Sequence, residues 1–449
     1  MKKIFKYIVT YLIIIIILIT LLFLASSFSS ELIYNNVKES SEVLLNEGNR
    51  KIVYIPYKKL KMQFDNYSDS LMINTMYSID SRTPLYSAMT AKKNYIPNVT
   101  NEIYQDTAGE LRTSSKYNYH NEVGELNDVI NGEKWESFEY ARYWHGYIVL
   151  IRPLLILFNL NQIRVLLFIL LVSLSVIVLI LIYKKIGLAS SIVFLFSLIG
   201  IEYFYMEYSI HGIFTIVTMM IASIIILANN KIKDYGLIFF ITGIITNFND
   251  LLTFPFITFG VPALVYFMVK YKDEDIKVRE KIKEFIKILT LYGLGYILTW
   301  ITKWVLMDLL YDRKLVITAI KQVLYRSLEN TENYDIITTI GRNIFADQYY
   351  IIITIIINII FNSLKYTLSK QKYKLVENVS AKEIINNIGI EMICAFIPFV
   401  IYIVLRNHSF NHAFFTYRNL IITNLAINFA IIKLYDLFFK KVESHEKKE

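Results

Sequence analysis

The sequence predicts an all-α polytopic membrane protein with about ten transmembrane helices, a large first extracytoplasmic loop, and additional interfacial or re-entrant helices. Three observations carry this prediction. The 449 residues are 55% hydrophobic, and the mean hydropathy of +0.42 lies above that of a soluble domain. Long apolar runs recur along the chain. Lysine and arginine gather in alternate connections between those runs.

The first apolar run, Ile4–Leu24, follows Lys2 and Lys3. It is longer than the roughly 7–15 apolar residues of a signal-peptide core, so we interpret residues 1–25 as a retained anchor with a cytoplasmic N-terminus. Further runs are long enough, or nearly so, to cross the bilayer. They are Ile163–Tyr183, Leu188–Phe204, Ile210–Ala228, Tyr235–Thr246, Leu251–Met268, Phe285–Met307, Tyr349–Leu364, Ile388–Leu405 and Leu420–Leu437.

The basic residues test this orientation. With the N-terminus inside, the connection 269–287 is cytoplasmic and rich in lysine and arginine, whereas the outer connections 204–209 and 247–250 contain neither. This asymmetry follows the positive-inside rule and predicts that both termini are cytoplasmic. The net charge of +9 is therefore a topology signal, and no nucleic-acid partner is expected.

The extracytoplasmic regions are unequal in size. Residues 26–145 form a loop of about 120 residues, long enough for a small domain that packs onto the bundle formed by 161–438. A second outer loop, 308–348, has apolar residues at helical spacing, which predicts an amphipathic helix in the membrane interface. Residues 439–449 form a cytoplasmic tail.

Segment 146–160 is apolar, but as a helix it rises only about 22 Å, short of the ~30 Å hydrocarbon core. It contains Arg152-Pro153, and counting it as a span would move the basic connection 269–287 outside. We therefore expect a re-entrant or interfacial helix, with Arg152 reaching the lipid headgroups.

Several kinds of chemistry have no signature in this sequence. There is no Gly-rich phosphate loop, so ATP-driven transport is not expected, and there is no Gly-x-Ser-x-Gly elbow. The single cysteine, Cys394, lies in an apolar run, where a small buried side chain is expected rather than a thiol nucleophile. A disulfide within the chain is impossible.

Four aromatic-rich polar clusters lie at span ends that share the outer side of the predicted topology. Ionisable side chains at the mouth of a helical bundle are costly to hold there and commonly mark a substrate or ion site. The clusters are 65–69, 142–145, 247–250 and 407–418.

The acidic candidates are Asp65, Asp69 and Asp250. Asp65 and Asp69 are spaced i,i+4, so on a helix both carboxylates share one face. Such a pair suits a general base or a divalent-cation site, although a capped surface helix with two solvated acids has the same pattern. Asp250 lies where two spans meet, and it is equally well placed to cap the following helix.

The cluster Arg142, Tyr143, Trp144 and His145 directly precedes segment 146–160. In a functional interpretation His145 is a proton donor, Arg142 is a phosphate ligand and the rings stack on a sugar. Tryptophan and tyrosine are also common at membrane interfaces, so the aromatic residues have a structural interpretation as well.

The last cluster contains His408 and His412 at i,i+4 spacing, followed by Tyr417 and Arg418 at the start of the final span. An arginine there suits a lipid phosphate, which guanidinium binds with two parallel hydrogen bonds. Snorkelling to the interface is the alternative. Two histidines could bind zinc, but no glutamate follows the first and no acid is near in sequence, so zinc is not favoured.

These features resemble the GT-C superfamily of membrane glycosyltransferases. The similarity rests on the large acidic first outer loop, the basic residues of later outer loops, and the strings 65–70, 143–146 and 412–418. It implies a bacterial plasma-membrane enzyme that takes a sugar from a polyprenyl-phosphate donor. The acceptor would be a glycan, lipid or protein of the cell envelope, and transfer would invert the anomeric centre at the outer face. An acid of the first outer loop, Asp65 or Asp69, would be the base, although no aspartate closely follows the first span.

Two other classes of function fit the sequence. One is a transporter or flippase of a lipid-linked glycan, which needs polar residues at mid-bilayer depth, whereas the polar clusters here lie at span ends. The other is a non-catalytic component of a polysaccharide assembly system. Membrane lipids are expected partners of all three classes, no cofactor is established by the residues, and a divalent cation is left open.

Overall fold

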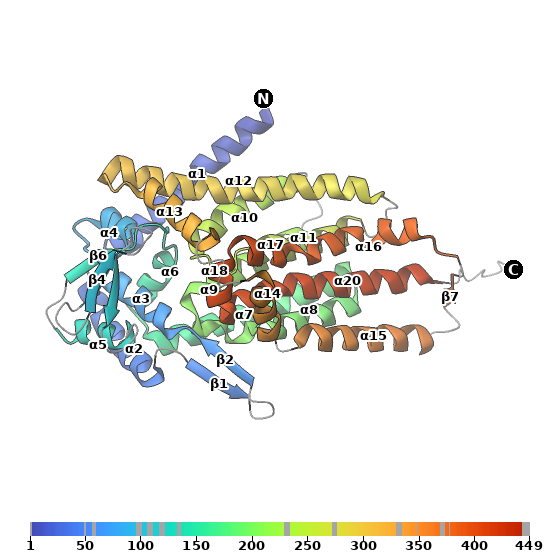
Figure 1. Ribbon diagram of the computed structural model, residues 1–449, viewed down its shortest axis with the longest axis horizontal. Coiled ribbons are helices and arrows are strands. Elements are labelled where there is room, and N and C mark those ends of the chain that lie inside the picture. Colours follow the sequence, from blue (N-terminus) through green and yellow to red (C-terminus); the bar gives the residue numbers. More distant parts are fainter. Residues whose placement is uncertain are drawn as a thin grey trace.

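The computed structural model describes residues 2–48, 51–55, 60–95, 101–105, 111–115, 122–132, 136–228, 234–271, 276–328, 335–347, 349–368, 373–376 and 378–441. Helices dominate these residues, and most run along the long axis of the molecule (Figure 1). The described strands form four two-stranded ladders. The all-α prediction is therefore confirmed, and the small ladders are additions that the sequence did not suggest.

Among the described residues, eight helical segments are long and apolar enough to cross a membrane, and two shorter apolar helices accompany them. This confirms a multi-pass membrane protein. The long segments are α1 (Lys2–Ser26), α7 (Leu160–Lys185), α8 (Leu188–Gly200) with η2 (Tyr203–Tyr208), α9 (Ile210–Ala228), α12 (Val278–Tyr311), α15 (Tyr350–Leu368), α16 (Ala381–Ala395) with α17 (Ile397–Val404), and α19 (Ala413–Thr416) with η3 (Tyr417–Leu420) and α20 (Ile421–Phe438). The shorter ones are α10 (Tyr235–Asn249) and α11 (Ile257–Lys270).

Most of the chain between α1 and α7 gathers at one end of the bundle, on the left of Figure 1. We call this part the end domain. Its elements are η1 (Ser30–Ile33), α2 (Tyr34–Glu47), β1 (Lys51–Ile55), β2 (Leu60–Phe64), α3 (Asn66–Tyr77), α4 (Pro84–Thr90), β3 (Lys92–Tyr95), β4 (Asn101–Gln105), β5 (Leu111–Ser115), α5 (Glu122–Ile130), β6 (Glu136–Glu139) and α6 (Ile148–Leu154). The ladders of the end domain pair β1 with β2, β3 with β6, and β4 with β5.

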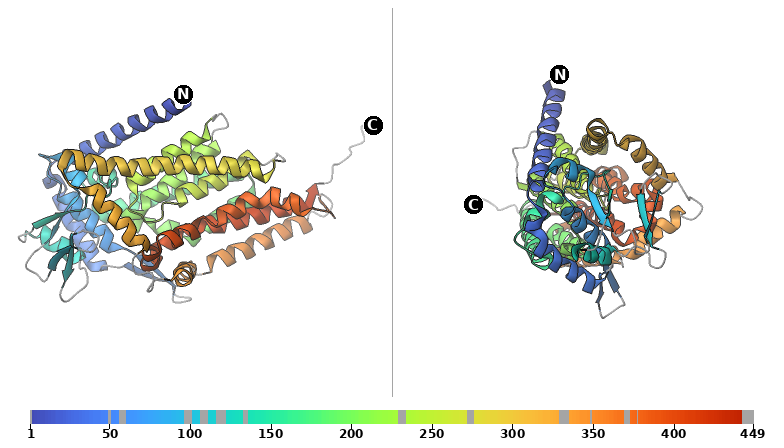
Figure 2. Two further views of the ribbon diagram at one scale, coloured as in Figure 1. Left: turned by 45° about the horizontal axis from the view of Figure 1, so that its top comes forward. Right: turned by 90° about the vertical axis from the view of Figure 1, so that its left-hand side faces the viewer.

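Helix α1 lies at the edge of the bundle (Figure 2). Near that end, the Tyr7 hydroxyl donates to Asp234 at 3.1 Å, and Lys3 and Lys6 lie 3.9 and 3.6 Å from the same carboxylate. Asp234 precedes α10, so the start of α1 and the start of α10 lie at the same end of the bundle. The predicted topology requires this arrangement.

Segment 146–160 contains α6, and its arginine differs from the sequence expectation. Arg152 is fully buried. Its guanidinium donates to the carbonyls of Met76, Ala25 and Phe28 at 2.8–3.0 Å. It therefore does not reach lipid headgroups. Because those three carbonyls belong to the end of α1 and to the end domain, Arg152 ties the domain to the membrane anchor.

The 34-residue α12 is long enough to pass the bundle and support the end domain, since a helix of this length extends about 51 Å. In the bundle, a Cβ on Gly243 would lie 2.2 Å from the Tyr292 carbonyl, so glycine permits close approach of α10 and α12. Further along, Lys303 donates to the Met89 carbonyl at 2.6 Å, and the Trp144 indole donates to the Thr299 carbonyl at 2.9 Å.

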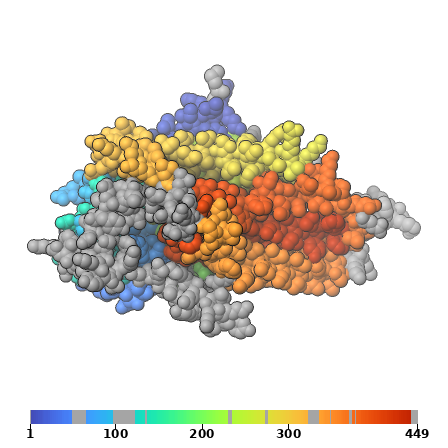
Figure 3. Space-filling view, in the orientation of Figure 1, coloured from blue at the N-terminus to red at the C-terminus, as the bar shows by residue number. Residues whose placement is uncertain are grey.

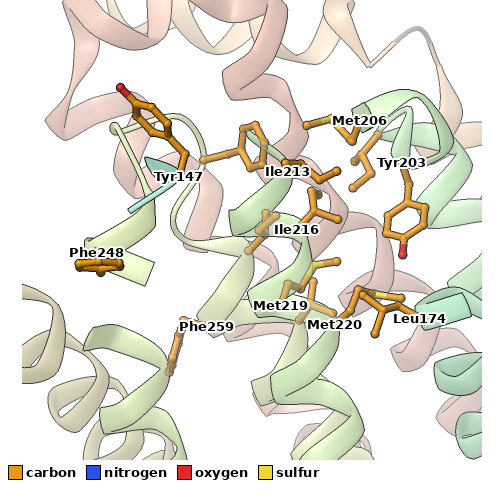
Figure 4. Packing of buried hydrophobic residues seen from close by; sticks show 14 of the residues in the cluster. Tyr147, Leu174, Tyr203, Met206, Ile213, Ile216, Met219, Met220, Phe248 and Phe259 are labelled. Atoms are coloured by element: carbon orange, nitrogen blue, oxygen red, sulfur yellow. The ribbon is translucent and has the colours of Figure 1, made fainter. Parts of the chain in front are cut away.

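One continuous core joins the bundle and the end domain. Figure 4 shows its centre, where Ile213, Ile216, Met219 and Met220 of α9 lie between Leu174 and the aromatic residues on the other side. Helix α9 is buried on most of its surface, and it therefore forms the interior of the bundle.

Asparagines at i,i+4 spacing join α15 to α20. The Asn358 amide donates to the Asn428 side chain at 2.9 Å, and the Asn362 and Asn428 amides continue the ladder along their own helices. Nearby, Lys433 pairs with Glu391 of α16 at 2.5 Å. In lipid, apolar surfaces provide no hydrophobic drive for association, so polar contacts contribute to holding α15 on the bundle.

The remaining described elements lie at the two ends of the bundle. Helices α13 (Leu315–Leu328), α14 (Ile336–Ala346) and α18 (Arg406–Asn411) lie toward the end domain (Figure 1). At the far end, β7 (Tyr373–Leu375) pairs with β8 (Phe439–Lys441). A helix is present in the loop 308–348, as expected, and it is α13. Its place in the membrane interface stays a prediction.

Candidate functional site

The structure brings the four polar clusters together where the end domain meets the bundle. The amide of Gly146, directly after the second cluster, donates to the Phe248 carbonyl at 3.0 Å, which places the second cluster beside the third. His408 Nε2 donates at 2.7 Å to the carbonyl of Leu252, two residues after the third cluster, which places the fourth cluster beside the third. The first cluster reaches α9 through Asp69, whose Oδ1 accepts from the Ile210 amide at 2.9 Å.

The two acids of the first cluster have different roles. Asp65 is the N-cap of α3 and accepts from the Ser68 amide and hydroxyl at 3.4 and 2.8 Å. Asp69, one turn inside the helix, is completely buried. Burial raises the pKa of its carboxyl, against an opposing contribution from His211. The two acids are thus one helical turn apart but differ in role, since Asp65 caps α3 and Asp69 is buried.

His211 is the partner of Asp69. Its Nδ1 lies 3.0 Å from the Ser209 hydroxyl and 4.0 Å from Asp69 Oδ1. Asp69 Oδ2 and His211 Nε2 are both buried, and neither has a hydrogen-bond partner among the described residues. Such groups are rare in native structures because each costs free energy, and they suggest a ligand, an ion or water.

Phe415 lies between the His211 ring and the histidines of the last cluster. The His211 ring packs edge-to-face on Phe415 at 5.6 Å, and Phe415 stacks on His412 at 5.1 Å. His408 and His412 have ring centroids 4.7 Å apart. Within the described parts of the chain, no three His, Cys, Asp or Glu side chains are grouped to hold a metal ion.

Asp250 organises the turn between α10 and α11. It accepts from the Leu252 and Thr253 amides at 2.9 Å and from the Thr253 hydroxyl at 2.6 Å, so it caps this turn rather than α11. Burial raises the pKa of its carboxyl, and the Thr253 contacts oppose that rise. Thr215, one turn after His211 on α9, lies 3.5 Å from Asp250. One face of α9 thus borders both buried acids.

The second cluster is buried between α12 and the end domain. Arg142 lies over the rings of Tyr140 and Tyr143, at 6.0 and 5.9 Å. Trp144 is held by α12. His145 Nε2 donates to the Tyr140 carbonyl at 2.7 Å, so its Nδ1 is the acceptor for the Tyr147 hydroxyl at 3.1 Å. Both ring nitrogens are occupied, which suits a neutral structural histidine.

Burial, reinforced by the charge of Lys303, lowers the pKa of His145 to about 3. The folded protein therefore binds fewer protons than the unfolded chain between about pH 6.5 and pH 3, and the free energy of unfolding falls as pH is lowered through this window. We expect His145→Asn to weaken the pH dependence of the free energy of unfolding by up to about 1.4 kcal/mol per pH unit. Asparagine is chosen because it tolerates the positive φ of 56° at this position. Thermal unfolding of the wild type and the variant between pH 7 and pH 4.5 measures the change. Parallel pH profiles would contradict the assignment.

Arg418 is buried and fully engaged by the protein. Its guanidinium donates to Glu202 Oε2 at 2.7 Å and to the carbonyls of Ile201 and Phe414 at 3.0 and 3.2 Å. Tyr417 is also buried, with its ring 5.0 Å from the guanidinium. These contacts give Arg418 a structural role. Its guanidinium is occupied by protein groups, so it is not placed to bind a lipid phosphate as the sequence suggested.

Two buried ion-paired clusters have no recognisable signal in the sequence that connects their members. Arg164 forms a two-pronged pair with Glu47 at 2.9 and 3.0 Å, beside α3. In the end domain, fully buried Lys93 pairs with Glu122 and Glu125. Burial raises the pKa of Glu125 to about 7. The i,i+3 spacing of the two glutamates was a local signal, but their lysine lies 29 residues away, and no sequence pattern connects them.

No protein-family model, no curated protein and no solved structure matches this chain.

Proposed function

We propose that this protein is a membrane glycosyltransferase that moves a sugar from a polyprenyl-phosphate donor to a cell-envelope acceptor. One observation carries the proposal. A buried carboxylate and a buried imidazole, Asp69 and His211, each retain an atom without a hydrogen-bond partner among the described residues, where the end domain meets the bundle. A base poised at the mouth of a helical bundle suits chemistry on a lipid-linked substrate.

In this reaction Asp69 accepts the proton of an acceptor hydroxyl as the oxygen attacks the anomeric carbon. The new carbon–oxygen bond forms while the bond from that carbon to the phosphate oxygen breaks. Polyprenyl phosphate leaves with the electron pair. Because a phosphate is a stable anion at neutral pH, it needs no proton from an acid. The raised pKa of Asp69 moves it toward the operating pH, which favours general-base catalysis.

The proposal includes a topology of ten spans, in which α10 and α11 cross together with the eight longer segments and both termini are cytoplasmic. Its support is the shared end of α1 and α10 and the basic connection 269–287. We expect an impermeant thiol reagent applied to intact bacterial cells to label a cysteine at position 110 and not one at 376, in a Cys394→Ala background. Labelling of 376 alone would reverse the topology.

A second candidate function is transport of a lipid-linked glycan. It is favoured by the buried asparagine ladder and the Glu391–Lys433 pair, which provide polar groups within the spans. These groups bond mainly to one another, so a structural role explains them more simply.

The test is release of polyprenyl phosphate by purified protein in detergent, supplied with a panel of polyprenyl-phosphate sugars and a cell-envelope glycan fraction. Release that depends on the glycan fraction supports transfer. If no donor is consumed, but the same protein in sealed vesicles moves a lipid-linked glycan between leaflets, the protein is a transporter and not a glycosyltransferase.

A further inference from the structure

Helix α14 has its polar face inside and its apolar face outside. Thr339 and Asn343 are completely buried. The Asn343 amide donates to the Ser409 carbonyl at 3.0 Å, and its oxygen accepts from Thr416 at 2.7 Å. Ile337 and Phe345, in contrast, are 83% and 72% exposed. A helix arranged in this way is suited to lie against lipid.

An apolar stripe on α17 continues this surface into the membrane. It is formed by residues at spacings of three and four, which share one helical face, and all of them are exposed. The stripe ends at Arg406, the first residue of α18. Its members are Phe396, Val400, Ile403 and Val404.

Two arginines border the same surface at the level where α17 ends. Arg342 of α14 lies 4.2 Å over the ring of Phe410, and Arg406 is spaced i,i+4 from Phe410 on α18. In the described part of the chain neither guanidinium has a carboxylate within ion-pair distance. Arg406 Nε is buried and has no hydrogen-bond partner there. Figure 3 shows α14 on the molecular surface beside the α17–α18 segment.

We propose that this surface holds the polyprenyl phosphate of the donor, with the phosphate between Arg342 and Arg406 and the chain along the α17 stripe. A cationic pair above an apolar stripe complements an amphiphile with a phosphate head. His408, two residues after Arg406, contacts the turn that Asp250 organises, so a phosphate here lies near the buried acids. This assignment rests on the proposed glycosyltransferase function. It gives the donor phosphate two arginine ligands in place of Arg418, which is occupied by Glu202 and backbone carbonyls.

The experiment is a binding titration of decaprenyl phosphate to purified protein in detergent, followed by native mass spectrometry. Each of Arg342→Gln and Arg406→Gln is expected to weaken binding about tenfold, because each removes a charge-assisted hydrogen bond. Arg279→Gln, at the far end of α12, is the matched control and is expected to bind as wild type does. Unchanged melting temperatures establish that the variants fold, and Arg342→Lys and Arg406→Lys, which keep the charge, are expected to retain part of the affinity.

Equal binding by wild type and both glutamine variants overturns the site. Equal affinity of wild type for phosphatidylglycerol overturns the donor assignment, because the surface then binds bulk lipid phosphate. Tight, arginine-dependent binding of decaprenyl phosphate supports the site even in a protein that transfers no sugar, so the outcome is distinct from that of the transfer assay.

Discussion

Replacing Asp69 with asparagine is expected to lower the rate of sugar transfer by about 10²–10⁴-fold, the usual cost of losing a general base. Asparagine preserves the shape of the side chain, and its oxygen can still accept from the Ile210 amide. It cannot accept the proton of the acceptor hydroxyl. Release of polyprenyl phosphate under saturating donor measures the effect.

Asp65→Asn is the matched control for this prediction. Asn is as good an N-cap as Asp, so the contacts of Asp65 with Ser68 are expected to survive and transfer to remain close to wild type. If Asp65→Asn abolishes transfer and Asp69→Asn does not, the base is Asp65.

The pH profile provides a second readout of Asp69. A carboxylate base works only when ionised, so transfer is expected to decline as pH is lowered through its raised pKa. In His211→Asn the midpoint is expected to move upward, because the opposing contribution of His211 is lost. An unchanged midpoint would remove His211 from the site.

Replacing Arg418 with methionine is expected to destabilise the fold by about 3–5 kcal/mol, because Glu202 is left as a buried charge without its partner. The melting temperature in detergent measures the loss. Adding Glu202→Gln to the same protein is expected to restore part of the stability, since the uncompensated charge is then removed.

Arg82→Ala provides the contrast for this prediction. Arg82 pairs with Asp80 at 2.8 Å, close to the 2.7 Å between Arg418 and Glu202, but the Arg82 side chain is 87% exposed. Little change in melting temperature is therefore expected. A melting temperature of Arg418→Met equal to that of wild type, combined with loss of donor binding, would return Arg418 to the role of phosphate ligand.

The sequence predicted the multi-pass helical class correctly and the roles of individual charges poorly. The apolar run predicts a span over residues 210–228, and α9 has those same bounds. Asp65 and Asp69 have identical local signals, yet one caps a helix and the other is fully buried. That difference depends on what packs against α3, namely the start of α9, which lies 141 residues away in the chain.

The small ladders and the buried clusters of the end domain were not anticipated either. Their strands are short, and several are rich in polar residues, so they lack the alternating pattern that identifies a half-buried strand. Lys93 looked like any solvated lysine because nothing nearby in sequence identifies Glu122 and Glu125 as its partners.

A multi-pass membrane protein could be predicted from the sequence alone, because the length of an apolar run is a local property that the bilayer thickness selects. The sequence also placed four polar clusters at span ends. Which charges have hydrogen-bond partners depends on the packing of distant segments. Arg418 meets Glu202 across 216 residues, and Arg152 meets carbonyls up to 127 residues away, so both are occupied. Asp69 and His211 retain open atoms because packing buries them without completing their hydrogen bonds, and no local pattern encodes that difference.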